Sequence, residues 1–474
     1  MRHTLILLLA VTLFSGCMLG PDYRRPSIDT PQAFRYQAQE TAQTANSEWW
    51  KQFNDPVLDQ LINEALANNK DVKIAAANIN QAAGVLMSTR SALFPQINYS
   101  GTAVRQQIPA INTLGLIPNP YTTLQALAGA SWEIDLWGRI RRLTEAAQAS
   151  LLASEEARQG VILSLVAEVA SSYIQLRSLD EQLLIAHRTL KSHGESLRLF
   201  ELQKKYGQVP QMTVEQARSQ YETAASYIPQ IELQIVQTEN TLCLLLGRNP
   251  GSIARGRTMA ELVPPSVPAN LPSQLLERRP DILQAEQNLV AANAQIGAAR
   301  ALYFPTISLT GALGYSSREL SDLFTGSSWN WNYGGSIIGP IFTAGNIRGQ
   351  VKQAEAAQLA LLINYQKVIQ SAFADTEYSL ASRQKLLDQL DAERKKVKAF
   401  QEYARLARLQ YNGGYAPYLT VLYAEEQLFP AELNAAQTQA AALISIVNIY
   451  KSTGGGWVME ADRLTKAAKN ESYK

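Results

Sequence analysis

Two pairs of side chains in this sequence are of types that carry out acid–base or metal chemistry. Glu133 and Asp135 lie two residues apart in an alternating segment, and paired carboxylates can act as general acid and base. The sequence places no histidine or nucleophile near them, so we expect both to be polar side chains on a wet lining. His187 and His193 lie six residues apart and do not share a helix face as metal ligands would. We therefore predict surface histidines, no metal site, no cofactor and no enzyme activity.

Cys17 carries a reactive group in a recognisable setting. A basic start, an apolar run from Leu5 to Phe14 and small residues before Cys17 are typical of a secretory signal peptide, here residues 1–16. The run is too short to span a bilayer. The segment before Cys17 resembles a bacterial lipoprotein box, in which the cysteine becomes the acylated first residue (N-palmitoyl, S-diacylglycerol). We predict a lipid anchor at Cys17 followed by a lipid-anchored extension over 17–55, with an ordinary leader that contains a cysteine as the alternative.

Length, composition and charge exclude several classes of protein. The chain has 474 residues, of which 46% are hydrophobic and 18% charged, whereas disordered chains combine low hydrophobicity with high net charge. No second stretch of about 18 apolar residues follows the leader, which argues against a polytopic helical membrane protein. A net charge of +2 provides no basic surface for nucleic acid. Cys243, in a helical run, is expected to be a small buried residue.

The chain contains an internal duplication with an offset of about 210 residues, because Asp71–Gly101 matches Asp281–Gly311. A nearly constant offset across separate matches is typical of tandem duplication. Each copy is predicted to contain a helix, a β-hairpin, a long helix, a turn and a second long helix. We therefore divide the chain into repeat 1 (56–265) and repeat 2 (266–458), followed by a solvated C-terminal tail (459–474).

Each repeat has two segments in which apolar and polar residues alternate, as in a β-strand with one apolar and one polar face. The predicted strands are 96–106 and 124–136 in repeat 1, and 306–316 and 329–341 in repeat 2. Strands of about ten residues with aromatic residues near their ends are typical of membrane-spanning β-barrels, in which the aromatics form a girdle. A soluble sheet with one wet face shows the same alternation and stays open as an alternative. The candidate girdle residues are Trp132, Trp329, Trp331 and Tyr333.

The strand count and the helix lengths both indicate an assembly. Four strands cannot close a barrel, and an open edge inside lipid leaves backbone groups unpaired at several kcal/mol each. The predicted long helices are 138–205 and 211–247 in repeat 1, and 345–412 and 417–452 in repeat 2. The first of each pair would reach roughly 100 Å if continuous, which requires neighbours along its length. We expect Pro229 and Pro430 to kink or break the second helix of each pair.

Several short motifs follow one another in a characteristic order. They are Gly20-Pro21-Asp22-Tyr23, Glu48-Trp49-Trp50, Leu276–Ile282, Ile296–Arg300, Phe304–Leu309, Leu419–Leu422 and Gly454–Trp457. In this order they resemble the outer membrane factor family, which is TolC-like, in its efflux lipoprotein branch (NodT/OprM type). The resemblance implies an α+β membrane protein with the TolC-like fold. Three identical chains, each contributing four strands, would form a twelve-stranded β-barrel that continues as a long α-helical barrel.

The resemblance also implies a function. The chain would be the outer membrane channel of a tripartite efflux system, a passive exit duct for drugs or other small solutes such as antibiotics. An inner-membrane transporter, proton-driven and of the RND type, would drive export through a periplasmic adaptor (membrane fusion) protein. The expected location is the outer membrane, with the helical tunnel in the periplasm. The alternatives are the duct of a type I protein secretion system and a lipid-anchored periplasmic coiled coil without a pore.

By this resemblance, the turns between the long helices are the adaptor-contact surface and the periplasmic mouth. A plain helix turn that needs Gly and Pro for its geometry is compatible with the same residues. Ala416 and Tyr423 stand where many relatives carry aspartate, which argues against an acidic ring at those positions. Glu215, Glu425 and Glu426 lie near the turns and are either mouth carboxylates or part of a solvated helix face. The tip residues are Tyr206, Gly207, Gln208, Val209, Pro210, Gly413, Gly414, Tyr415, Ala416 and Pro417.

Overall fold

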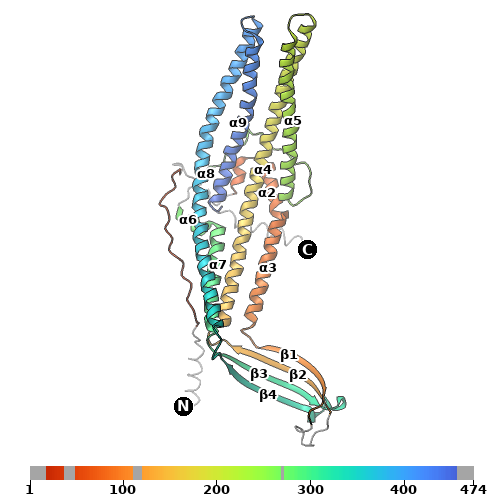
Figure 1. Ribbon diagram of the computed structural model, residues 1–474, viewed down its shortest axis with the longest axis vertical. Helices are drawn as coiled ribbons and strands as arrows, with labels where there is room; N and C mark the ends of the chain where they lie inside the picture. Colours follow the sequence, from red (N-terminus) through yellow and green to blue (C-terminus); the bar gives the residue numbers. More distant parts are fainter. Residues whose placement is uncertain (1–17, 37–47, 110–119, 268–271, 456–474) are drawn as a thin grey trace. The chain divides into compact units, whose positions relative to one another are not determined.

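The computed structural model describes residues 18–36, 48–109, 120–267 and 272–455 (Figure 1). The predicted signal peptide, the lipid anchor at Cys17 and the C-terminal tail over 459–474 lie outside the described residues. The chain forms two compact units, and each unit takes residues from both repeats. The first unit contains residues 78–155 and 284–366 with the N-terminal segment, and the second contains 28–77, 156–283 and the remainder.

A four-stranded antiparallel sheet forms part of the first unit. Its strands are β1 (Gln96–Gln106), β2 (Tyr121–Ile134), β3 (Thr306–Ser317) and β4 (Trp329–Ile338), in the spatial order β1-β2-β3-β4. β2 begins three residues earlier than the sequence predicts and ends two residues earlier, because Asp135 already belongs to the turn into the next helix. β4 ends three residues before the predicted boundary at 341, since Gly339 and Pro340 follow it and proline cannot donate to a strand ladder.

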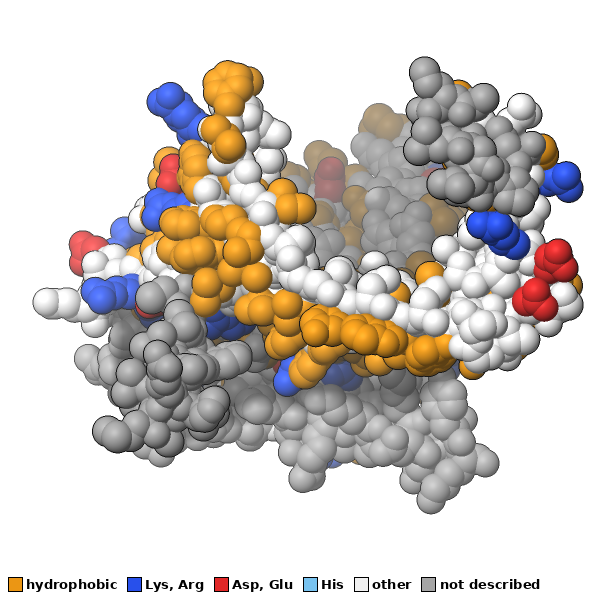
Figure 2. All heavy atoms as spheres, turned by 90° about the horizontal axis from the view of Figure 1, so that it is seen from below, with side chains coloured by type: hydrophobic (Ala, Val, Ile, Leu, Met, Phe, Trp, Pro, Cys, Tyr) orange, Lys and Arg blue, Asp and Glu red, His pale blue; other side chains and the backbone are white. Residues whose placement is uncertain are grey.

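The register brings most large apolar residues of the four strands to one face of the sheet, with Val104, Leu127 and Ile338 as exceptions. Ile97 pairs with Ala130, Ala130 pairs with Gly311, and Gly311 pairs with Tyr333. Because side chains alternate along a strand, one such row fixes the faces of the neighbouring rows as well. Most polar residues therefore share the opposite face, although Arg105 lies on the apolar one. Figure 2, which views the strand end of the chain, shows hydrophobic side chains gathered in a band along the sheet.

Two helices of 67 residues each, α4 (Arg139–Lys205) and α8 (Asn346–Asn412), are continuous and begin one residue after the predicted starts. Two helices of 35 residues, α5 (Gln211–Leu245) and α9 (Tyr418–Ser452), follow the turns. α5 ends two residues before the predicted boundary, because Gly247 takes a φ of 72° and leaves the helical conformation. α9 begins at Tyr418 because Pro417 is its N-cap, with extended backbone.

Of the kinks or breaks expected at Pro229 and Pro430, the breaks are wrong, since α5 and α9 run on through both prolines. A proline inside a helix removes one hydrogen bond and clashes with the preceding turn. Neighbouring buried residues offset this cost. Phe429 and Ala431, on either side of Pro430, are both buried, and Phe429 belongs to an apolar cluster with residues of α4.

The core of the second unit is built around two tryptophans. Trp49 and Trp50, in the short helix η1 (Trp49–Phe53), are 1% exposed, and Trp49 stacks on Tyr450 of α9 with ring centroids 5.0 Å apart. The helix α2 (Pro56–Asn68) and parts of α4 and α5 complete this cluster, which also buries Cys243 as predicted. α4 contains a segment apolar enough to cross a membrane by length and composition, and 56% of that segment is buried in the chain. We assign it to this core.

The remaining helices are α3 (Lys70–Ser91), α6 (Pro272–Arg278) and α7 (Pro280–Ala301). α3 and α7 are the corresponding helices of the two repeats, and each leads into the first strand of its own hairpin. A single turn and one proline separate helix from strand in both repeats, because proline cannot continue the helix.

Candidate functional sites on the sheet and at the helical tips

The apolar face of the sheet exposes large aromatic side chains. Trp331 and Tyr333 are 63% and 81% exposed and stack with centroids 5.7 Å apart, although neither has a covering partner among the described residues. Trp329 is the first residue of β4 and contacts Tyr315 of β3 edge-to-face, with ring centroids 5.3 Å apart. Large exposed aromatics on one face of a sheet favour a second surface or a lipid phase against that face.

Trp132 lies near the last residue of β2, at the opposite end of the sheet from Trp329, and its side chain forms a hydrogen bond to the backbone. Its indole N–H donates to the carbonyl oxygen of Leu93 at 3.0 Å, and the side chain is half-buried. Trp137, which the sequence analysis did not select, lies in the turn after β2. Its N–H donates to Pro305 O at 2.8 Å, and its ring packs on Phe304 at 4.7 Å. An amphipathic indole with its N–H bonded to backbone suits the boundary between apolar and wet surroundings.

The expectation of a wet lining is wrong for Asp135, whose side chain is 8% exposed, whereas Glu133 is 30% exposed. Glu133 accepts hydrogen bonds from Arg139 through both carboxylate oxygens, at 2.8 and 2.9 Å. Asp135 accepts from the backbone N–H groups of Ile140 and Arg141 at 3.1 and 2.8 Å. Carboxylates at a helix N-terminus satisfy its free N–H groups and interact favourably with its dipole. Both residues therefore organise the turn between β2 and α4.

The two helical tips have the same backbone geometry. Gly207 and Gly414 have φ angles of 72° and 77°. At the first tip, Gln208 N–H donates to Gln203 O at 2.9 Å, and the equivalent bond at the second tip runs from Tyr415 to Gln410, also at 2.9 Å. These are Schellman ends, in which a left-handed glycine closes the helix. Pro210 and Pro417 then act as N-caps with extended backbone, and for Pro417 the helix therefore begins one residue after its predicted start at 417.

An aromatic cluster below the tips joins the two repeats. Phe200 of α4 is 1% exposed and contacts Tyr418 of α9 at 4.2 Å and Tyr411 of α8 at 6.3 Å. Burial, followed by the nearby charge of Glu425, raises the pKa of Tyr418 to about 12. The tips themselves are exposed, and Tyr415 is 89% accessible. The tips therefore expose tyrosine side chains above a packed aromatic cluster. Val209 and Ala416 of the tips are half-buried.

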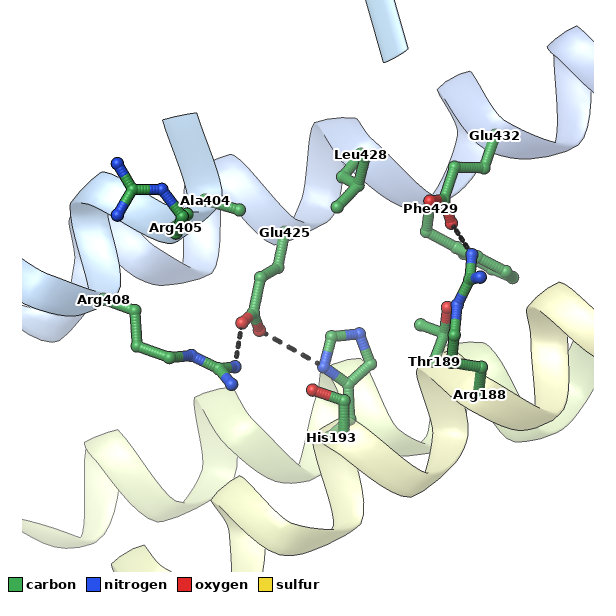
Figure 3. Close-up of a pocket in the computed structure, with 11 residues that line it drawn as sticks. Arg188, Thr189, His193, Ala404, Arg405, Arg408, Glu425, Leu428, Phe429 and Glu432 are labelled. Carbon is green, nitrogen blue, oxygen red and sulfur yellow. Dashed lines mark hydrogen bonds and ion pairs between the residues drawn. The ribbon is translucent and has the colours of Figure 1, made fainter. Parts of the chain in front are cut away.

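The three candidate mouth carboxylates lie in different surroundings. Glu215 is exposed on α5, where Gln211 donates to it and Arg218 lies 3.5 Å away. Glu426 is also exposed. For Glu425, the expectation of a solvated helix face is wrong, because its side chain is 11% exposed and lines a pocket between α4, α8 and α9 (Figure 3). Tyr423, on the same helix, is exposed.

His193 is also buried, so the prediction of a surface histidine is wrong for this residue. The face of α4 that carries it packs toward α9, and its Nδ1 lies 3.5 Å from Glu425 Oε2. Arg408 of α8 donates to the other oxygen of the same carboxylate (Figure 3). Burial acts to raise the pKa of Glu425, but His193 and the Arg408 charge outweigh it and lower this pKa. His187 is exposed as expected.

Comparison with known proteins identifies the family. The family model described as outer membrane efflux protein matches residues 61–248 and 271–455, one stretch in each repeat. The chain belongs to this family. The toluene efflux pump outer membrane protein TtgC of Pseudomonas putida is 36% identical over 481 residues, covering 99% of both chains. "Probable outer membrane lipoprotein SilC" of Salmonella typhimurium is 36% identical, covering 94% of this chain and 97% of SilC.

Solved structures agree with this assignment. The open state of the MtrE outer membrane channel of Neisseria gonorrhoeae is 32% identical and has a TM-score of 0.85, covering 93% of this chain and 99% of MtrE. The predicted family and the TolC-like fold class are therefore confirmed. The chain is an outer membrane channel component of an efflux system, with its helices in the periplasm.

In this efflux channel, the residue that the sequence analysis missed most clearly is Arg142 on α4. Its side chain is 2% exposed and hydrogen-bonds to the N-terminal segment. We call residues 18–27 the N-terminal strap. Arg142 Nε donates to Leu19 O at 3.0 Å, and Nη2 lies 2.8 Å from Asp22 Oδ1. The strap passes so closely that a Cβ on Gly297 would lie 2.5 Å from Leu19 O. No sequence signal identifies Arg142, because an arginine in a helix is ordinarily solvated.

Proposed function

We propose that three copies of this chain form a single twelve-stranded barrel in the outer membrane. The observation that carries the proposal is the sheet order, because β1 and β4 are edge strands with no further partner among the described residues. An open edge in lipid leaves backbone N–H and C=O groups unpaired, at several kcal/mol each. The strands alternate in direction, so β4 of one copy and β1 of the next can pair as an antiparallel ladder.

The two faces of the sheet support this arrangement. The row that contains Ile97 and Tyr333 would face lipid, with Trp329 and Trp331 as part of an aromatic girdle. The opposite row contains Asn98 and Asn332 and would line the aqueous pore. Trp132 would belong to the girdle at the other end of its strand.

We assign adaptor contact and the periplasmic mouth to the two tips. Support comes from the matched Schellman ends and from Tyr206 and Tyr415, which are 70% and 89% exposed. Exposed aromatic side chains are enriched in protein–protein contact surfaces. Glu215 and Glu426 remain candidate mouth carboxylates, whereas the burial of Glu425 argues for a structural role. The energy for export would come from a proton-driven inner-membrane transporter of the RND type, joined through a periplasmic adaptor.

The cargo would be small solutes such as drugs. Toluene is named for one relative, and a passive duct selects chiefly by the pump that feeds it. A type I protein secretion system could use the same kind of duct and is the second candidate. We further propose that Cys17 is acylated and anchors each chain to the outer membrane, as the name of SilC supports. Several acyl chains on one residue give stable attachment, at about 0.8 kcal/mol for each buried methylene.

A three-part experiment tests the proposed function. The mass of the detergent-solubilised complex should correspond to three chains, and wild type should incorporate labelled palmitate whereas Cys17→Ala should not. The purified complex should also conduct ions in planar lipid bilayers. A monomer without conductance would contradict the duct and leave the lipid-anchored coiled coil. An unlabelled wild type would contradict the anchor alone.

A further inference from the structure

An ionic cluster with a largely buried histidine and carboxylate and an exposed arginine connects the two repeats a short distance below the tips. It consists of His193 on α4, Glu425 on α9 and Arg408 on α8 (Figure 3). Arg408 lies four residues before the end of α8, and Glu425 lies seven residues after the start of α9. The cluster is therefore placed where a movement of one helical hairpin against the other would separate its members.

The carboxylate of Glu425 is only partly satisfied. One oxygen accepts from Arg408, whereas Oε2 has no hydrogen bond of ordinary length to any described residue. Its nearest polar neighbour is His193 Nδ1 at 3.5 Å, beyond the usual 2.7–3.2 Å of an N–H···O bond. A buried acceptor without a close donor is costly, and a cation beside it removes that cost. A proton on His193 would supply this cation.

We propose that His193 is a proton-operated lock on the periplasmic mouth. Protonation of its imidazole creates a buried charge pair with Glu425 that holds α4 against α9, and loss of the proton weakens the link. This charge pair exists only while the repeats are packed together, so proton binding and packing are thermodynamically linked. Mild acid then favours the closed tips and higher pH favours their separation. The proposal rests on the assignment of the tips to the mouth.

Other charged and titratable groups surround His193 and Glu425. Glu425 has a lowered pKa, so its stabilising charge is complete above its ordinary range and is lost only in stronger acid. The pKa of Tyr418 is raised to about 12, which keeps this phenol neutral. Arg188 is paired with Glu432 at 2.6 Å, and Arg405 with Glu402 on its own helix. From α5, the ring of Tyr221 lies near the neighbouring Gly194, where a Cβ would come within 3.3 Å of it.

Histidine is the side chain that ordinarily changes charge between pH 5.5 and 8. His187 provides a matched control, because it is the same residue type on the same helix but exposed. In the purified full-length complex, amide hydrogen exchange over residues 418–428 is measured at pH 5.5 and 8 and corrected for the intrinsic rate. We expect protection to fall by about tenfold in wild type and in His187→Gln, since one linked proton changes an equilibrium by at most about tenfold per pH unit. His193→Gln and Glu425→Gln should show no such fall.

Conductance in planar bilayers provides a second readout at the same two pH values. Open probability should rise with pH in wild type and in His187→Gln, and stay constant in His193→Gln. If amide exchange over residues 418–428 responds equally to pH in wild type and in His193→Gln, the proposed role of His193 is wrong. If wild type conducts at neither pH but its exchange follows the expected pattern, the duct is contradicted while the link between proton binding and packing stands.

Discussion

At the scale of single residues, buried polar groups tie together segments far apart in the sequence. Asp55 is fully buried and accepts from the N–H groups of Val57 and Arg257, at 2.9 and 3.0 Å, and from the hydroxyl of Tyr173 at 2.8 Å. Asp55 is the N-cap of α2, and no sequence motif singled it out. Its two distant partners could not be predicted, because local sequence patterns carry no information about such pairings. The same reason explains why the burial of His193 and Glu425 was missed.

Asp55→Ala should lower the free energy of unfolding by about 3 kcal/mol, since it leaves three donors without a partner in the interior. The change can be measured by urea denaturation, followed through the fluorescence of the nearby Trp49 and Trp50. Asp388→Ala is the matched control, because Asp388 is 64% exposed and pairs with Lys385 on its own helix. An exposed pair contributes less than about 1 kcal/mol. Equal midpoints for the two variants would contradict the role of Asp55.

At the scale of elements, hydropathy and turn residues predict most boundaries to within three residues. Pro95 and Pro305, which follow the ends of α3 and α7, and the glycines Gly207 and Gly414 at the tips are local signals with a direct structural cause. The helix ends that they mark were therefore predicted. β4 and the prolines in α5 and α9 were predicted less well. Their outcome depends on packing, as at Pro430, or on the end of hydrogen bonding between strands, as at Ile338.

Gly207→Ala and Gly414→Ala should each loosen a tip without unfolding the chain. A Cβ at either position meets no atom within 4 Å, so the cost is that of the left-handed backbone alone, about 1–2 kcal/mol. Exchange of the Gln208 or Tyr415 amide, respectively, should accelerate by about tenfold, while the thermal midpoint of the whole chain stays unchanged. Gly251→Ala is the control, because Gly251 also has open space around it but lies outside the tips. The same acceleration in all three variants would refute a special role for the tip glycines.

At the scale of the whole molecule, each compact unit is built from elements of both repeats. β2 of repeat 1 pairs with β3 of repeat 2, and α4 of repeat 1 packs against α9 of repeat 2. The sequence predicts the repeat and the number of strands, but not this pairing between copies, because a repeat pattern does not say which copies touch. The observed register adds that all four strands share one apolar face, which alternation within single strands cannot establish.

This shared face leads to a prediction for Tyr333 and Asn332, which are adjacent in β4, both exposed, and on opposite faces of the sheet. Tyr333→Arg should place a charge against lipid, at about 2–4 kcal/mol near the bilayer midplane. Such a cost in each of three copies should sharply reduce the amount of trimer recovered from the outer membrane. Asn332→Arg should leave trimer recovery near wild type and shift the ion selectivity of the pore toward anions, because the added charges would face water. Fractionation and bilayer recordings measure both effects. Equal losses of trimer from the two variants would contradict the assignment of the apolar face to lipid.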